Sequence, residues 1–232
     1  MLAIVDYNAG NTYNVQKAFA YLGVDTVLTA DRDTILNATG IILPGVGAFK
    51  TAMNALHERD LVSTLQQAAK AGRPLIGICL GMQLLFDSSD EYGFCEGLGL
   101  IPGKVTELPP TPGLMIPHMG WNENSYVKLT PATGSQPDFS QLDKQYTYFV
   151  HSYYAVTEPE YITATADYGV AVPSVVQRDN VCGMQFHPEK SASVGIGLLR
   201  EFCRSVGELP VDGVAPNATA APKEAYEGGV AR

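Results

Sequence analysis

Cys79 stands in a sequence pattern that suits a nucleophile. It lies between Gly77 and Gly81, after an apolar run that starts near Pro74, and leucines follow it at helical spacing. The pattern predicts a strand that turns sharply into a helix with the thiol at the corner, where the turn leaves no room for a neighbouring Cβ. The positive N-terminus of that helix would favour the reactive thiolate. The alternative is that Cys79 is a small buried hydrophobic residue, as most lone cysteines are.

His187, Pro188 and Glu189 form a second pattern with chemical potential. In an extended segment, residues two positions apart point to the same side, and proline keeps the segment extended. Glu189 is therefore expected to accept the far N–H of the His187 ring, as the acid does in a nucleophile–histidine–acid triad. An ordinary surface turn is the alternative for this tripeptide alone, whereas its combination with the cysteine pattern favours catalysis.

An attack on an acyl carbon also requires donors for the oxyanion. The backbone N–H of Leu80, directly after the cysteine, is one expected donor. The loop of Gly45, Val46 and Gly47 is the second, and its glycines would let a peptide flip to present or withdraw an N–H. A plain tight turn is the alternative for this loop.

The hydrophobic periodicity predicts the elements that position these residues. Before residue 95 it predicts strands over 2–7, 24–28, 41–43 and 74–79 and helices over 12–22 and 51–71. Beyond that point it predicts strands over 105–108, 126–129, 148–153, 162–165, 172–177 and 181–186, a hairpin turn at 179–180 and a helix over 192–205.

This order of elements predicts an α/β fold. Alternating strands and helices give a mostly parallel central sheet flanked by helices, and the later short strands give an additional antiparallel sheet. Residues 1–206 are expected to form one domain, with a loop over 131–145 and a flexible tail over 207–232, which lacks periodicity.

Composition narrows the class of protein. Of the 232 residues, 46% are hydrophobic and 17% charged, as in a soluble enzyme. The net charge of −9 and the absence of a basic cluster argue against nucleic acid as a partner. No apolar run is long enough to span a membrane, and the four cysteines are scattered without a C-x-x-C pair. We therefore expect a cytoplasmic protein.

The loop at 44–47, the segment 77–83 and the segment 185–189 together resemble the class I (triad) glutamine amidotransferases. The segments 96–103, 117–122 and 148–153 are further similar to the glutaminase subunits of imidazole glycerol phosphate synthase, a family of histidine biosynthesis. The likeness spans about residues 1–206. It implies a flavodoxin-like fold and hydrolysis of glutamine to glutamate and ammonia through a thioester on Cys79, with His187 and Glu189 as partners and without a metal or organic cofactor.

The resemblance also implies further roles. Substrate would be held by Val46, Gly47, Leu80, Gln83, Glu91 and the backbone of Ser152 and Tyr153. A (β/α)₈ cyclase subunit would receive the ammonia and make imidazole glycerol phosphate and an aminoimidazole carboxamide ribotide. Its interface would include Met119, Trp121, Asn122, Tyr148, His151 and Lys190. Without the resemblance, we would expect Trp121 to be a core aromatic, Lys190 a solvated charge and Glu91 part of a solvated helix end. His57 and His118 are expected to be structural or exposed and not catalytic.

Three other functions are alternatives to this one. The glutaminase of another complex, such as pyridoxal phosphate synthase, has a different loop in place of residues 44–47 and does not account for residues 118–122. A non-catalytic binding module with the same fold would not be expected to keep Cys79, His187 and Glu189 together. A stand-alone cysteine hydrolase would not account for Gln83.

Overall fold

The computed structural model describes residues 1–8, 11–127 and 136–209. Its helices are α1 (Thr12–Tyr21), α2 (Arg32–Asn37), α3 (Phe49–Glu58), α4 (Leu61–Lys70), α5 (Leu80–Gln83) and α6 (Ala192–Ser205). Its strands are β1 (Leu2–Val5), β2 (Thr26–Thr29), β3 (Gly40–Gly45), β4 (Leu75–Cys79), β5 (Phe86–Ser89), β6 (Cys95–Glu96), β7 (Ile101–Glu107), β8 (His118–Tyr126), β9 (Tyr146–His151), β10 (Tyr153–Val156), β11 (Ile162–Asp167), β12 (Ala171–Arg178) and β13 (Val181–Met184).

A nine-stranded sheet forms the centre, in the order β2-β1-β3-β4-β13-β12-β11-β8-β9. The strands from β2 through β13 pair in parallel, and those from β13 to β9 pair antiparallel. In the parallel part, β3, β4 and β13 are neighbours, so their carboxyl ends meet at one edge. Ligand sites of α/β proteins lie at such an edge.

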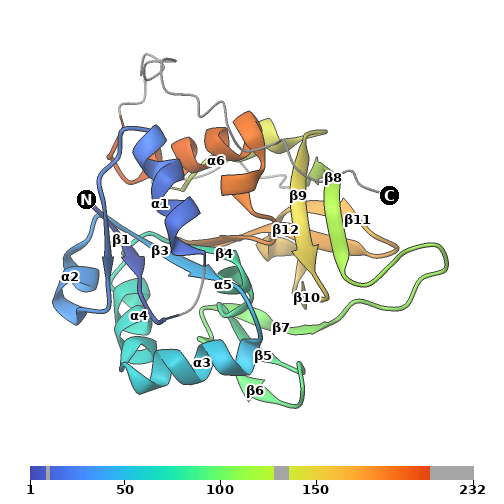
Figure 1. The fold of residues 1–232 in the computed structure, drawn as a ribbon, viewed down its shortest axis with the longest axis horizontal. Coiled ribbons are helices and arrows are strands. Elements are labelled where there is room, and N and C mark those ends of the chain that lie inside the picture. The colour runs from blue at the N-terminus through green and yellow to red at the C-terminus, as the bar shows by residue number, and fades with distance from the viewer. Residues whose placement is uncertain (9–10, 128–135, 210–232) are drawn as a thin grey trace, which may run out of the picture.

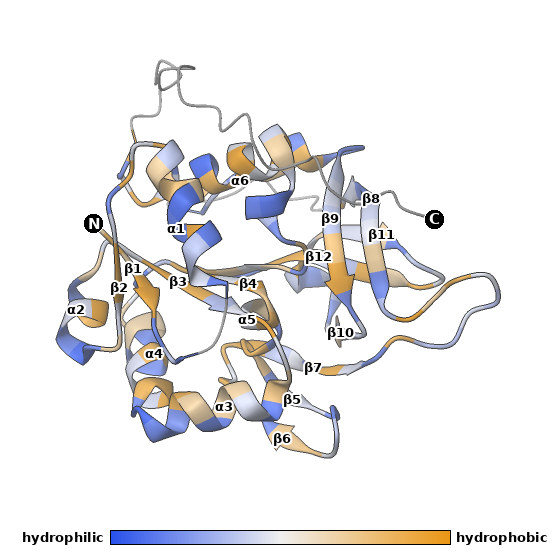
Figure 2. Cartoon of the chain, viewed as in Figure 1, coloured by the Kyte–Doolittle hydropathy of each residue, from blue (hydrophilic) through white to orange (hydrophobic). Residues whose placement is uncertain are grey.

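Helices cover both faces of the parallel part (Figure 1). Along β1, Leu2 and Ile4 pack with α1 and α6, whereas Ala3 and Val5 pack with α2, α3 and α4. This is the alternation that a strand buried on both sides requires. Figure 2 shows the corresponding hydropathy, with hydrophobic strands inside and helices that carry hydrophilic residues on their outer surfaces.

A smaller sheet lies beside the first, in the order β10-β7-β5-β6. It is antiparallel at both edges and parallel between β5 and β7. Strand β10 follows β9 directly, with Ser152 between them, so the chain passes from the large sheet into the small one at this point. The predicted strand over 148–153 is therefore two strands in two sheets.

Most predicted elements are confirmed, including the two-residue hairpin turn at 179–180, where Arg178 pairs with Val181. The prediction of a single helix over 51–71 is wrong, because Asp60 takes a left-handed conformation (φ 56°) that separates α3 from α4. Helix α2 and strand β5 were not predicted, and β8 begins at His118 rather than at residue 126. The predictions for residues 128–135 and 210–232 lie outside the described residues.

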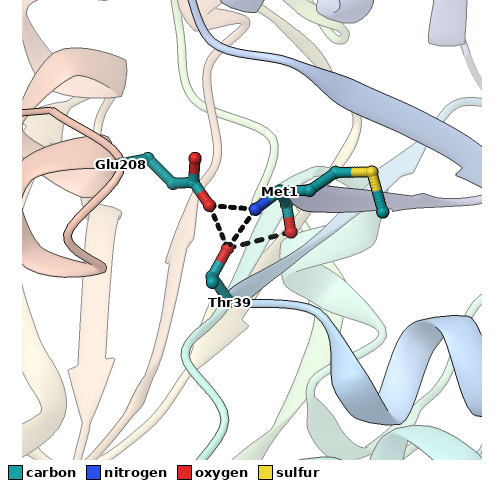
Figure 3. A network of polar contacts seen from close by, with 3 residues as sticks. All are labelled: Met1, Thr39 and Glu208. Atoms are coloured by element: carbon teal, nitrogen blue, oxygen red, sulfur yellow. Dashed lines mark hydrogen bonds and ion pairs between the residues drawn. The ribbon is translucent and has the colours of Figure 1, made fainter.

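The described C-terminal residues pack on the N-terminal strand. Glu208 accepts hydrogen bonds from the Met1 ammonium and the Thr39 hydroxyl. The ammonium nitrogen also donates to Oγ1 of Thr39 at 3.0 Å (Figure 3). Leu209 packs against the hydrophobic core. Glu208 and Leu209, which were expected to belong to the tail, thus contact the rest of the domain.

None of the helices in the described ranges is long and apolar enough to cross a membrane.

Candidate active site

Cys79 is the last residue of β4 and directly precedes α5. Its backbone is strained, with φ 54° and ψ −114°. A Cβ on Gly81 would lie 1.8 Å from the carbonyl oxygen of Leu43, and one on Gly77 would lie 2.5 Å from the carbonyl oxygen of Gly81. Only glycine fits at these two positions, so the sharp strand-to-helix turn predicted from the sequence is confirmed.

His187 and Glu189 lie just beyond β13, the strand beside β4. The ring Nδ1 of His187 is 2.8 Å from Oε1 of Glu189, and both side chains are almost fully buried. The N–H of His187 donates to the carbonyl of Tyr148 at 2.9 Å, which fixes the backbone of this segment to β9. The expected contact between the histidine and the acid is present.

The histidine also interacts with the thiol. Burial by itself lowers the pKa of His187, but hydrogen bonds to Cys79 and Glu189 and the negative charges of both residues outweigh it and raise the pKa to about 9. An imidazolium at neutral pH is a proton donor held beside sulfur. The structure therefore brings Cys79 together with His187 and Glu189, which lie far from it in the sequence.

The loop after β3 lies beside the sulfur. Gly45 pairs with Cys79 across the parallel strands, so Val46 and Gly47 follow at the same sheet edge. Gly47 has φ 97°, a backbone conformation that suits glycine, and the Val46 side chain is exposed. Leu80, the other expected donor of an oxyanion N–H, is the first residue of α5. Val46, Gly47 and Leu80 thus directly follow the ends of two neighbouring strands, at the edge of the sheet where Cys79 lies.

Four further residues expected to hold substrate lie near this edge. The Gln83 Nε2 donates to the carbonyl of Tyr153 at 2.8 Å and to Oε1 of Gln185 at 3.0 Å. Ser152 and Tyr153 are half-buried at the start of β10. Glu91 is buried, and its Oε2 accepts the N–H of Phe49 at 2.6 Å.

The buried contact between Glu91 and the N–H of Phe49 shows that Glu91 is not part of a solvated helix end. The preceding residues form strand β5, and the carboxylate of Glu91 caps the N-terminus of α3. Glu91 thereby joins α3, the helix that follows the loop at residues 45–47, to the segment after β5.

The residues expected at a partner interface divide into two groups. Met119 and Trp121 are exposed on one face of β8, and the Trp121 ring meets Tyr148 edge-on with centroids 6.2 Å apart. The Lys190 ammonium lies 5.9 Å from the centre of the Tyr148 ring. Trp121 is therefore a surface aromatic and not a core residue.

Asn122 and His151 form the second group. Asn122 is half-buried on the opposite face of β8, and His151 is only 7% exposed. The His151 ring contacts His118 and the carbonyl of Tyr153, so it lies inside the molecule. It was expected at the interface but forms almost no part of the surface.

Sequence reasoning missed the roles of Tyr7 and Gln185 and the partner of His118. The buried hydroxyl of Tyr7 donates to the carbonyl of Pro44, and Oε1 of Gln185 accepts from the amide of Gln83. His118 is buried against His151, which agrees with the structural alternative expected for it. Each of these contacts crosses between segments far apart in the chain, so local patterns carried no signal for the pairings.

Across the described ranges, no group of three or more His, Cys, Asp and Glu side chains is arranged to hold a metal ion.

The fold and this site define a class I glutamine amidotransferase, and the family model described as "Glutamine amidotransferase class-I" matches residues 3–205. Solved structures share the fold. A "Crystal structure of glutamine amidotransferase" matches with a TM-score of 0.68 at 18% identity, over 88% of this chain and 98% of that one. The "Structure of PurLQS from Thermotoga maritima" matches with 0.67 at 18% identity, over 88% and 97%.

Relatives with higher identity narrow the family. The "Imidazole glycerol phosphate synthase subunit HisH" of Lacticaseibacillus casei is 54% identical over 87% of this chain and 94% of its own. The subunits of the same name from Lactiplantibacillus plantarum and Streptococcus sanguinis are 55% and 50% identical, over 87% and 90% of this chain and 94% and 98% of theirs. The chain belongs to the HisH family of class I glutamine amidotransferases.

Proposed function

We propose that this chain is the glutaminase subunit of an imidazole glycerol phosphate synthase, acting in histidine biosynthesis, and that Cys79, His187 and Glu189 are its catalytic triad. The observation that carries the triad is the position of the His187 ring, hydrogen-bonded at Nδ1 to Glu189 and close enough to Cys79 for the cysteine to raise its pKa. Family membership carries the assignment to the synthase.

In this mechanism the Cys79 thiolate attacks the side-chain carbonyl carbon of glutamine. The N–H of Leu80 and an N–H of the loop at Val46 and Gly47 stabilise the oxyanion. His187 donates its proton to the departing nitrogen, which leaves as ammonia, and a thioester remains on the sulfur. His187 then takes a proton from water, whose oxygen attacks the thioester and releases glutamate.

The remaining residues hold the substrate's amino-acid end. Glu91 pairs with the α-ammonium, and Gln83 with the backbone of Ser152 and Tyr153 orients the rest of the molecule. Rotation of the peptide between Gly45 and Gly47 presents or withdraws the second oxyanion donor. The two glycines and the exposure of Val46 and Gly47 support this motion.

The ammonia passes to a (β/α)₈ cyclase subunit. The exposed Met119, Trp121 and Lys190 around the half-buried Tyr148 support a docking surface there, since large aromatic side chains on a surface are typical of interfaces. A cytoplasmic location, with neither nucleic acid nor membrane as partner, belongs to the same proposal. The negative net charge supports the absence of nucleic acid.

Glutamate release from glutamine tests this function. It is measured for the chain alone and then with the matching cyclase and its ribotide ligand. We expect little turnover alone and a large rise in the liganded complex. Equal turnover in both cases would identify an autonomous glutaminase, and no turnover in either would reject the triad.

A further inference from the structure

Two buried histidines outside the triad face each other across strands β8 and β9. His118 and His151 are directly paired in the antiparallel register, and Nδ1 of His118 lies 3.0 Å from Nε2 of His151. The His118 ring is stacked between Phe149, with centroids 4.6 Å apart, and Tyr168, at 3.9 Å. Both rings are thus held in fixed orientations, although neither belongs to the triad.

Their hydrogen bonds allow only one direction of donation. Nδ1 of His151 lies 2.9 Å from the carbonyl oxygen of Tyr153, and a carbonyl can only accept, so this nitrogen carries the proton. In a neutral ring Nε2 is then an acceptor, and His118 must donate to it from Nδ1. Nε2 of His118 accepts in turn from the amide of Asn122 at 3.2 Å. The orientation of that amide is set by its other contacts, since Nδ2 also donates to the carbonyl of Asp167 and Oδ1 accepts the N–H of Glu123.

Both rings remain neutral under ordinary conditions. Burial lowers the pKa of His118 to about 4. Burial and the nearby His118 and His187 lower the pKa of His151 to about 3, against the opposing effect of its bond to Tyr153. The chain of donors therefore runs unbroken from Asn122 to Tyr153 at neutral pH.

The acceptor at the end of this chain belongs to a segment expected to bind glutamine. The carbonyl of Tyr153 receives two donors, Nδ1 of His151 and Nε2 of Gln83. In an antiparallel strand the N–H and C=O of one residue point to the same side, and alternate residues point to opposite sides. Since the carbonyl of Ser152 accepts from Leu108 of the small sheet, the N–H of Tyr153 points the other way, toward Gln83.

We propose that His118 and His151 are positioning residues for glutamine: they hold the Tyr153 peptide so that its N–H meets the α-carboxylate of the substrate. This inference rests on the proposed function, because it assigns the Ser152–Tyr153 backbone to substrate binding. Neither histidine touches glutamine or the reacting atoms. Their effect is therefore on the KM for glutamine and not on kcat.

Two substitutions of His151 separate this role from a purely structural one. The amide of Asn replaces the ring at the position of Nδ1, so His151→Asn keeps a donor for Tyr153 but loses the acceptor for His118. The amide of Gln replaces it at the position of Nε2, so His151→Gln keeps the acceptor and loses the donor. His57→Asn, an exposed histidine at the end of α3, is the matched control.

The steady-state kinetics of each variant are measured in the complex with the cyclase and its ribotide ligand, and thermal unfolding is followed in parallel. We expect His151→Gln to raise the KM for glutamine about tenfold with kcat within about twofold, and His151→Asn to keep most of the wild-type KM although it is the less stable variant. Equal KM values in the two variants, or KM values that follow stability, would overturn the proposal. An inactive wild type would instead reject the proposed function.

The direction of the donor chain is tested without activity, by nitrogen-15 NMR of the histidine rings. We expect His118 and His151 to carry the proton on Nδ1 and not to titrate between pH 5 and pH 8. A proton on Nε2 of either ring, or a titration near pH 6.5, would overturn it. His118→Phe keeps the stacked ring without its nitrogens. Because Nδ1 of His151 still donates to Tyr153, the proton is expected to stay on Nδ1 while the Nε2 signal of His151 shifts on losing its donor. An unchanged Nε2 signal would show that His118 does not donate to it.

Discussion

The hydroxyl of Tyr7 donates to the carbonyl oxygen of Pro44 at 2.6 Å. Tyr7 follows β1 and Pro44 lies near the end of the neighbouring strand β3, so the bond joins the segment after β1 to the end of β3. Burial, and to a lesser degree the charge of Cys79, raise the pKa of the Tyr7 hydroxyl, which therefore remains a donor at neutral pH. Pro44 directly precedes the oxyanion loop, so Tyr7 anchors the start of that loop.

Tyr7→Phe is expected to lower the free energy of unfolding by about 1–3 kcal/mol, because it leaves a buried carbonyl without its donor. Chemical denaturation measures this change. Tyr13→Phe, on an exposed tyrosine of α1, is the control and should have little effect. A loss no larger than that of the control would mean that the bond does not anchor the loop.

Replacing the nucleophile separates glutamine hydrolysis from ammonia use. Cys79→Ala is expected to reduce glutamine-dependent turnover of the complex by at least about a thousandfold, because no thioester forms. Turnover with free ammonium should remain largely intact, since the cyclase then receives ammonia directly. Measuring both activities in one preparation provides the control, and a joint collapse would indicate that Cys79 is structural.

The raised pKa of His187 predicts an alkaline limit to activity. The bonds to Cys79 and Glu189 favour the protonated ring, so the proton is lost only as the pH passes about 9, well above the ordinary value of 6.5. Glutaminase kcat/KM should fall above that pH, because the departing nitrogen then lacks its donor. The protonated His187 ring also contributes to the free energy of unfolding. This contribution is fully present below about pH 6.5 and is lost as the pH rises through about 9.

Glu189→Gln removes the negative partner of His187 and is expected to move this alkaline limb to lower pH. Its loss of activity should be smaller than that of Cys79→Ala, because orientation of the ring is only part of the triad's work. The pH profiles of wild type and variant, measured in the same buffers, test both statements. An unmoved limb, or a loss equal to that of Cys79→Ala, would contradict the role given to Glu189.

The steric demand at the turn after Cys79 predicts a large effect of one methyl group. Gly81→Ala is expected to lower the free energy of unfolding by about 3 kcal/mol or more, because its Cβ would collide with the backbone carbonyl of Leu43. Gly72→Ala is the control, since a Cβ there meets no atom within 4 Å and only the positive φ of 80° opposes it, at about 1 kcal/mol. A loss in Gly81→Ala no larger than in Gly72→Ala would show that a small backbone shift relieves the collision with Leu43.

The exposed aromatic cluster predicts where the cyclase binds. Trp121→Ala is expected to raise the Kd of the complex about tenfold or more, because large aromatic side chains at the centre of an interface carry much of the binding energy. Titration calorimetry with the isolated cyclase measures this, with Tyr21→Ala on helix α1 as an exposed control. Unchanged affinity would place the interface elsewhere.

The sequence alone determined the features that depend on local chemistry. The glycines beside Cys79 predicted the tight turn, the two-residue spacing of His187 and Glu189 predicted their contact, and the periodicity predicted most strands and helices. These features could be predicted because the responsible atoms lie within a few residues of each other. The family resemblance extended the predictions to substrate and partner residues.

Tertiary structure decided the rest, for physical reasons visible at particular positions. Neither glycine nor proline ends helix α3. The helix ends because Asp60 adopts a left-handed conformation, which the hydrophobic periodicity does not reveal. The chain changes sheets at Ser152, although residues 148–153 look like one strand. His118 and His151 carry no pattern that links them, and only the antiparallel register of β8 and β9 places one ring against the other. Contacts of this kind depend on which strands become neighbours, and that follows from the packing of the whole chain.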